Sequence, residues 1–258
     1  MKTFLTIAIL IFLFSFSGIN ASAQTGDDTG LPIQSWGVLK LKENKLFMHV
    51  FQWPTDGKLY VGGLLSPFGK AYLLSNPELP LPVKRVNKKD VYISIPKNAL
   101  DTISTVIVLE LNDKIEVDAT RFISSNIPIT RLLALDASQH GNGFIFGDSK
   151  KGKYYVEGWK NKDQYLSWRI RTMESARYRI IIRYLTGENC GGAYLLTVDD
   201  TYEFGYSVNS DKNNSSITQE LAELTITGGT HVISLQPTSV TKGELMKLLE
   251  IQLIPVED

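Results

Sequence analysis

Cysteine is almost absent from this sequence, since Cys190 is the only one among 258 residues. A single cysteine can form no internal disulfide, which excludes a disulfide-stapled fold and a metal site built on paired cysteines. The chain also has no formal net charge, because 27 Lys and Arg balance 27 Asp and Glu. Nucleic-acid phosphates require a basic footprint, so we expect no nucleic-acid partner.

Recognisable catalytic motifs are also missing. The chain has no nucleophile elbow, no glycine-rich phosphate loop and no His-Glu-x-x-His zinc motif. His49 and His231 lie in strand-like runs, which favours a packing role, and His140 lies in the loop SQHGNG, exposed to solvent or to a ligand. Cys190, in the loop ENCGG, is expected to be a free thiol. We therefore expect a protein that is not an enzyme.

The one long hydrophobic run lies at the N-terminus. Lys2 precedes an apolar stretch over residues 5–16, and Ala-Ser-Ala ends at Ala23. This pattern predicts a secretory signal peptide over residues 1–23, and the run is short for a helix that spans a bilayer. After cleavage we expect no membrane-spanning segment. With one cysteine, an exported chain fits the bacterial periplasm or cell surface better than an animal secretion.

Short alternating runs separated by turn signals make up the remaining chain. Between residues 35 and 117 the runs are WGVLKLK, KLFMHVFQW, GKLYVGG, KAYLLS, VYISIP and STVIVLEL. After a crossing segment, a second series such as YLSWRIRT, YRIIIRYL and KLLEIQLIP fills residues 131–256, and the helical run TKGELMKL is too short to change the class. The sequence predicts an all-β protein with two β-sandwich domains, a Greek-key sandwich followed by a jelly roll.

The quoted strands carry a family resemblance. WGVLKLKENKLFMHVFQWPTDGKL, KAYLL, VYISIP and DTISTVIVLEL resemble the C-terminal β-sandwich domain of the retaining α-L-fucosidases. The second half is similar to the jelly-roll carbohydrate-binding modules that often follow bacterial glycoside hydrolases, through YLSWRIRT, YRIIIRYL, LTITGGTHVISLQP and LEIQLIP.

The resemblance implies a chain without the family's catalytic domain. Those fucosidases hold their two catalytic carboxylates in a barrel that precedes the sandwich, and such a barrel needs about 200 residues or more. Only a dozen residues separate Ala23 from Trp36, and the signal peptide predicts that the chain begins here. We therefore expect an exported accessory protein for glycan utilisation that binds carbohydrate through the jelly roll.

Sugar sites combine an exposed aromatic ring with amide and carboxylate groups. The run EGWKNKDQ offers this chemistry around Trp159, and tyrosines after CGGA and VDD could complete a rim. The alternative is that Trp159 caps the hydrophobic end of the jelly roll. The candidate carbohydrate-binding residues are Trp159, Asn161, Asp163, Gln164, Tyr194 and Tyr202.

A structural calcium ion is a further implication of the resemblance. Related jelly-roll modules often hold one between an acidic residue near the first strand and another near the last, and the matching residues are Asp136 and Glu250. Calcium requires several oxygen ligands at once, so these two carboxylates would form only part of a site. No other cofactor is expected.

The run KLFMHVFQW is apolar on both faces of the expected strand. Leu46, Met48 and Val50 would point to one face, with Phe47, Phe51 and Trp53 on the other. We hypothesise that the second face is an interface covered by the jelly roll, a partner chain or a separate glycoside hydrolase. It could equally belong to a central strand covered by its own domain's loops. An interaction protein without sugar affinity is thus the alternative function, and a glycosidase a minor one.

Overall fold

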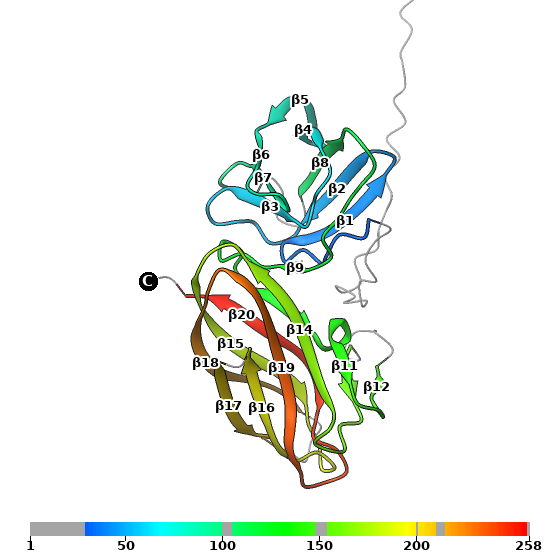
Figure 1. Cartoon of the computed structure of the whole chain (residues 1–258), viewed down its shortest axis with the longest axis vertical. Helices are drawn as coiled ribbons and strands as arrows, with labels where there is room; N and C mark the ends of the chain where they lie inside the picture. Colours follow the sequence, from blue (N-terminus) through cyan, green and yellow to red (C-terminus); the bar gives the residue numbers. More distant parts are fainter. Residues whose placement is uncertain (1–28, 100–104, 148–153, 200, 210–214, 257–258) are drawn as a thin grey trace, which may run out of the picture.

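The computed structural model describes residues 29–99, 105–147, 154–199, 201–209 and 215–256, and Figure 1 shows two β-structures stacked along the long axis. The predicted signal peptide lies outside these residues. The all-β prediction is confirmed, since the described elements are twenty strands and one short 3₁₀ turn, η1 (Ala134–Asp136). Within these ranges, no helix is long and apolar enough to cross a membrane.

The first sandwich packs a five-stranded sheet against a three-stranded one. The first sheet has the order β1-β2-β8-β4-β5 and the second the order β3-β7-β6. The strands are β1 (Gly37–Lys42), β2 (Lys45–Val50), β3 (Lys58–Gly62), β4 (Phe68–Leu73), β5 (Asn76–Leu81), β6 (Val83–Arg85), β7 (Asp90–Ser94) and β8 (Thr105–Leu111). Alternate residues of these strands, such as Leu46, Met48, Val91 and Ile93, are fully buried and form one core.

Strand β2 ends three residues earlier than the pattern predicts. The backbone N–H groups of Phe51 and Gln52 both donate to the carbonyl oxygen of Trp36, at 2.8 and 3.0 Å, which turns the chain after Val50. Phe47 shares its strand face with His49, whereas Phe51 and Trp53 lie beyond the end of the strand. The prediction that Phe47, Phe51 and Trp53 form one face of a single strand is therefore wrong.

The second sandwich packs two six-stranded sheets face to face. One has the order β12-β13-β20-β15-β18 with β10 also paired to β20, and the other the order β11-β14-β19-β16-β17 with β9 paired to β14. Its strands are β9 (Arg121–Phe122), β10 (Thr130–Leu133), β11 (Ser138–His140), β12 (Ile145–Phe146), β13 (Val156–Glu157), β14 (Tyr165–Thr172), β15 (Ala176–Leu185), β16 (Gly192–Val198), β17 (Tyr202–Ser207), β18 (Ser216–Ile226), β19 (Gly229–Val240) and β20 (Lys247–Pro255).

The core between these sheets follows the alternation of the sequence. Trp168, Tyr178 and Tyr184 are at most 3 % exposed, as their alternation with aliphatic residues predicts. The expected helical run over residues 241–248 is wrong, because Lys247 already begins β20. The backbone N–H of Leu245 donates to the carbonyl of Trp159, which replaces the hydrogen bond that a helix would have supplied.

The segment between the sandwiches is packed against both of them. Strand β9 pairs in parallel with β14 of the second sandwich, through Arg121↔Ile170 and Phe122↔Arg171. The ring of Phe122 lies so close to Gly62 of the first sandwich that a Cβ atom there would sit 2.3 Å from the Phe122 Cβ. Glycine at position 62 thus permits the two sandwiches to approach.

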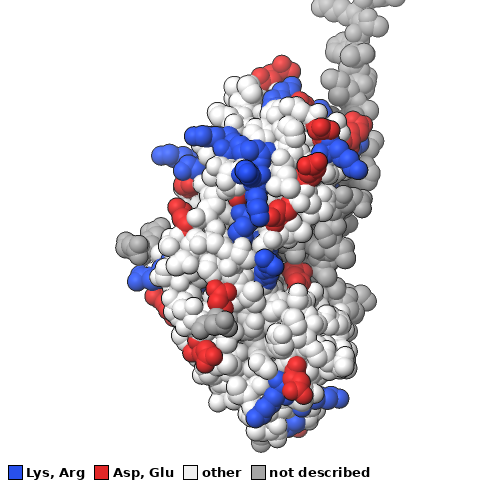
Figure 2. Space-filling view, viewed as in Figure 1, with Lys and Arg blue, Asp and Glu red and all other residues white. Residues whose placement is uncertain are grey.

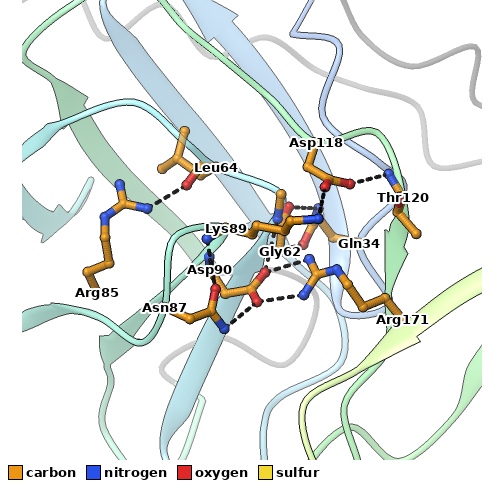
Figure 3. A network of polar contacts seen from close by, with 11 residues as sticks. Gln34, Gly62, Leu64, Arg85, Asn87, Lys89, Asp90, Asp118, Thr120 and Arg171 are labelled. Atoms are coloured by element: carbon orange, nitrogen blue, oxygen red, sulfur yellow. Dashed lines mark hydrogen bonds and ion pairs between the residues drawn. The ribbon is translucent and has the colours of Figure 1, made fainter. Parts of the chain in front are cut away.

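A polar network crosses the same boundary (Figure 3). The guanidinium of Arg171 donates two hydrogen bonds to the Asp90 carboxylate, at 2.6 and 2.7 Å. The same carboxylate accepts hydrogen bonds from the backbone N–H of Gly63 and the side-chain amide of Asn87. Further along the boundary, the Gln52 side chain makes two hydrogen bonds to the backbone of Ile129. These contacts fix the orientation of one sandwich relative to the other.

Candidate functional site

Trp159 lies inside the second sandwich and not on its surface. Its side chain is 0 % exposed and belongs to the hydrophobic core, where its indole N–H donates to the carbonyl of Val156 at 3.0 Å. The ring of Phe144 packs edge-on against it, with centroids 5.0 Å apart. An enclosed indole offers no face to a sugar. The expectation that Trp159 is the exposed stacking ring is wrong, and it caps the core.

Gln164 holds two loops together at this end of the sandwich. Its side-chain oxygen accepts hydrogen bonds from the backbone N–H groups of Lys160 and Asn161, and its amide nitrogen donates to the carbonyls of Asn142 and Gly158, each at 2.9 Å. All four bonds are to the backbone, and the residue is 1 % exposed. Gln164 therefore positions the loops and is not available to a ligand.

Beside these loops, strands β11 and β14 present a stacked pair of rings to solvent. His140 and Tyr165 lie with ring centroids 3.9 Å apart and an angle of 3° between the planes, and both are partly exposed. Hydrogen bonding fixes the His140 ring, since its Nε2 lies 2.9 Å from the hydroxyl of Ser167. Tyr165 begins β14, where the core-facing Leu166 follows it, and β11 with His140 is the edge strand of that sheet.

Two of the expected polar residues lie in the turn that leads into Tyr165. Asn161 and Asp163 are exposed, and the Asn161 side chain caps the turn by accepting the backbone N–H of Asp163 at 3.0 Å. The Gln236 side chain, from β19, donates to the carbonyl of Lys162 at 2.7 Å and closes the same turn. We call His140, Asn161, Asp163 and Tyr165 the ring surface.

Tyr165 is not among the candidate residues predicted from the sequence. The alternation of Leu166, Trp168 and Ile170 places Tyr165 on the outer face of β14, but it gives no sign that a histidine stacks on it. That contact depends on the pairing of β11 with β14, in which His140 lies opposite Tyr165.

The expected rim tyrosines lie elsewhere. Tyr194 is 0 % exposed in the core, and its burial raises the pKa of its phenol far above the usual value. Tyr202 is partly buried on β17, the edge opposite to β11, where it stacks on Phe204 with centroids 6.2 Å apart. The structure thus does not bring Tyr194 and Tyr202 to the ring surface, and that part of the expected site is wrong.

Asp136 and Glu250 do not fit a calcium site. Both carboxylate oxygens of the buried Glu250 are taken by arginines, with Arg131 at 2.5 Å and Arg183 at 2.7 Å. Asp136 lies 3.7 Å from the Arg121 guanidinium, and burial raises its pKa, which disfavours the ionised form that calcium requires. Within the described ranges, no cluster of three acidic, histidine or cysteine residues could hold a metal ion.

The remaining candidate reactive groups serve the fold. The His231 ring lies 2.7 Å from the Asp199 carboxylate and 2.8 Å from the carbonyl of Thr227, so both ring nitrogens are engaged in fixing a hairpin. Cys190 is 3 % exposed rather than in an open loop, and burial raises the pKa of its thiol. A buried, protonated thiol is a poor nucleophile.

The expected interface residues of the first sandwich differ in their exposure. Phe47 is partly buried, and Trp53 packs against the core while its indole N–H donates to the carbonyl of Pro96 at 2.8 Å. Phe51 is 51 % exposed. The hydrogen bonds across the sandwich boundary given above involve Gln52 and Asp90 of the first sandwich, so the described contact with the jelly roll runs along other residues.

A small recess lies at the sandwich boundary, and polar side chains that line it are engaged in hydrogen bonds within the protein. It is lined by Gln34, Trp36, Tyr60, Phe122 and Asn126 among others. The Gln34 side chain donates a hydrogen bond to the carbonyl of Gly62 and accepts one from its backbone N–H. The Asn126 amide donates to the carboxylate of Asp56 and to the carbonyl of Lys58. These polar groups hold the boundary together, which leaves the ring surface as the better candidate for ligand contact.

No family model matches the chain, and no curated protein does. Among solved structures, an α-L-fucosidase from Vibrio sp. strain EJY3 is similar at 16 % identity and a TM-score of 0.54, covering 88 % of this chain and 41 % of the enzyme. This chain thus spans less than half of that enzyme's length. At this identity the likeness shows a shared fold.

Two shorter neighbours match the chain less well. CBM35 from Cellvibrio japonicus Abf62 has 15 % identity and a TM-score of 0.40, over 49 % of this chain and 92 % of the module. A family 35 carbohydrate binding module from Clostridium thermocellum has 17 % identity and a TM-score of 0.39, over 49 % of this chain and 98 % of the module. The structural neighbours of this all-β chain therefore include a fucosidase and two carbohydrate-binding modules.

Proposed function

We propose that this protein is an exported, non-catalytic accessory protein that binds carbohydrate through the ring surface of its second sandwich. The observation that carries the proposal is the stacked and partly exposed pair of His140 and Tyr165, with the exposed Asn161 and Asp163 in the turn just before Tyr165. The resemblance to the non-catalytic part of an α-L-fucosidase supports the same class of function and suggests a role beside glycoside hydrolases.

The chemistry of the ring surface suits a sugar. A pyranose has an apolar face of C–H groups that packs on an aromatic ring, and its hydroxyls both donate and accept hydrogen bonds. Asp163 supplies acceptors, Asn161 supplies both donors and acceptors, and Tyr165 supplies ring area with a hydroxyl. Because the His140–Tyr165 stack and the Gln164 bonds hold these groups in place, little conformational entropy is lost on binding.

A glycan-array screen of the purified protein, followed by calorimetric titration of any glycan that binds, tests this function. Replacing Tyr165 by Ala should weaken binding at least fivefold, because ring contacts to a ligand contribute on the order of 1–3 kcal/mol. The matched control is Phe51→Ala, which removes an exposed ring from the first sandwich. Equal loss in both variants, or no glycan bound at all, would contradict the proposal.

A second candidate function is protein docking through the first sandwich. The exposed side chain of Phe51 would lie at the centre of such a contact, because interaction sites are contiguous apolar patches and the partly exposed Phe47 and Trp53 would have to extend this one. Under this reading Phe51→Ser would abolish capture of a partner glycoside hydrolase or self-association, measured by sedimentation velocity. Tyr165→Ala would leave that association unchanged.

A further inference from the structure

The outer face of the three-stranded sheet carries tyrosines and lysines together. Tyr60 on β3 lies opposite Tyr92 on β7, and Tyr92 lies opposite Lys84 on β6. Their sequence neighbours Leu59, Val61, Val91 and Ile93 are all fully buried, so alternation directs these side chains away from the core. Lys58 lies two residues before Tyr60 on the same face. We call Lys58, Tyr60, Lys84 and Tyr92 the aromatic–basic face.

The rings on this face lie in a defined arrangement. Tyr60 and Tyr92 meet edge to face, with centroids 5.8 Å apart at 66°, and both are partly exposed. Phe122, from the segment between the sandwiches, packs 5.9 Å from Tyr60 and holds the far side of that ring. The ammonium of Lys58 lies 6.0 Å from the Tyr92 ring centroid, which is the outer limit of a cation–π contact.

The charge on this face is positive and partly uncompensated. Lys84 on this face and Lys88 in the connection between β6 and β7 are exposed, and no carboxylate in the described part of the chain lies within ion-pairing distance of either. Lys58 is paired with Asp56, at 3.5 Å. Figure 2 shows Lys and Arg gathered over the region where Figure 1 places β3, β6 and β7.

Two of the carboxylates near this face are paired with basic side chains, and a third approaches it. Asp90 is bonded to Arg171, Asp118 is paired with Lys89, and Glu174 approaches Tyr60 from the second sandwich. Over residues 35–117 there are 11 Lys and Arg against 8 Asp and Glu. The first sandwich as a whole thus carries a modest excess of positive charge.

From this geometry we infer that the aromatic–basic face is a second binding surface, and that its ligand is an acidic polysaccharide. The tyrosine rings suit the apolar faces of sugars, and the lysines suit carboxylate or sulfate groups placed at intervals along a chain. A duplex or single-stranded nucleic acid carries a phosphate at every nucleotide and needs a denser basic footprint than this face supplies. The surface lies on the other sandwich from the ring surface and does not depend on it.

Affinity electrophoresis and calorimetry on the purified protein test the inference, with heparin and hyaluronan as acidic polysaccharides and dextran as the neutral one. The acidic chains should bind and dextran should not, and added salt should weaken binding because it screens exposed charges. The double variant Lys84→Glu/Lys88→Glu should weaken heparin binding at least tenfold. Tyr92→Leu, which keeps an apolar side chain on the sheet, should weaken it about threefold to tenfold.

The matched control is Lys40→Glu/Lys42→Glu. These lysines are also exposed, on β1 of the same sandwich, and the change in net charge is the same, so heparin binding should fall far less. Equal loss in both double variants would overturn the inference, because binding would then follow net charge and not this face. Equal binding of dextran, or tighter binding of single-stranded DNA than of heparin, would overturn the ligand class. Normal heparin binding by Lys84→Glu/Lys88→Glu would overturn the site.

Discussion

Asp90 of the first sandwich and Arg171 of the second form a two-fold hydrogen-bonded ion pair, although they lie 81 residues apart in the chain. The Asp90 side chain is 0 % exposed and that of Arg171 10 %. Because the pair is enclosed, the loss of either partner would leave a charge buried without a counter-charge. The pair therefore couples the stability of one sandwich to the correct placement of the other.

Replacing Arg171 by Met should destabilise the whole protein. The Asp90 carboxylate would keep its bonds from Gly63 and Asn87 but lose its counter-charge, at a cost of about 3–5 kcal/mol. The free energy of unfolding in urea measures the effect. Adding Asp90→Asn to the same chain should restore part of the loss, since a neutral amide is easier to bury.

The control for that variant is Arg177→Met. Arg177 forms a 4.0 Å pair with Glu223 in which both side chains are more than 40 % exposed. Exposed pairs contribute at most about 1 kcal/mol, so the free energy of unfolding of this variant should be close to that of the parent. A cost at Arg171 no greater than that at Arg177 would refute the coupling role of the Asp90–Arg171 pair.

Gly62→Ala should disturb the boundary between the sandwiches. The added Cβ would lie 2.3 Å from the Phe122 Cβ, so Phe122 and the segment that carries it must shift. We expect a cost of about 1–3 kcal/mol, as for other overpacked cores. Gly205→Ala is the control, because a Cβ atom there would meet nothing within 4 Å. Equal melting temperatures of the two variants would contradict the close packing at Gly62.

Trp159→Ala should unfold or strongly destabilise the second sandwich. The substitution removes a fully buried indole and its hydrogen bond to Val156, and large-to-small changes of this kind cost about 3–5 kcal/mol. Lost glycan binding in this variant would thus reflect lost structure. Near-ultraviolet circular dichroism tells the cases apart, since a native spectrum with unchanged stability would contradict the buried position of Trp159.

Acid should weaken the contact between Lys89 and Asp118. The hydrogen bond from the Lys89 ammonium, at 2.5 Å, holds the pKa of the Asp118 carboxyl well below its usual range. A lowered pKa in the folded state adds stability that is present above about pH 4 and is lost as the pH falls further.

The variant Asp118→Asn isolates this contribution. It should cost about 1 kcal/mol at pH 7, because the pair is partly exposed, and the difference from the parent should shrink below about pH 4. Unfolding curves at pH 7, 5 and 3 measure it. A difference that stays constant or grows toward acid would reverse the assigned sign.

Alternation in the sequence determined the fold class and most of the core. Leu166, Trp168 and Ile170 recur at every second position, and a strand must direct such residues to one face, so their burial follows from local geometry. The same reasoning placed Tyr178 and Tyr184 in the core. It failed at Phe51, where a hydrogen bond to Trp36 turns the chain after Val50.

Only the tertiary structure decided which groups reach the surface at the candidate sites. Trp159 lies in a loop, where no periodicity applies, and its burial depends on Phe144 and on the Gln164 bonds to a loop about twenty residues earlier. The His140–Tyr165 stack likewise requires the pairing of β11 with β14. Strand periodicity is a local property of the chain, whereas loop paths and sheet neighbours are set by contacts between residues far apart in the sequence.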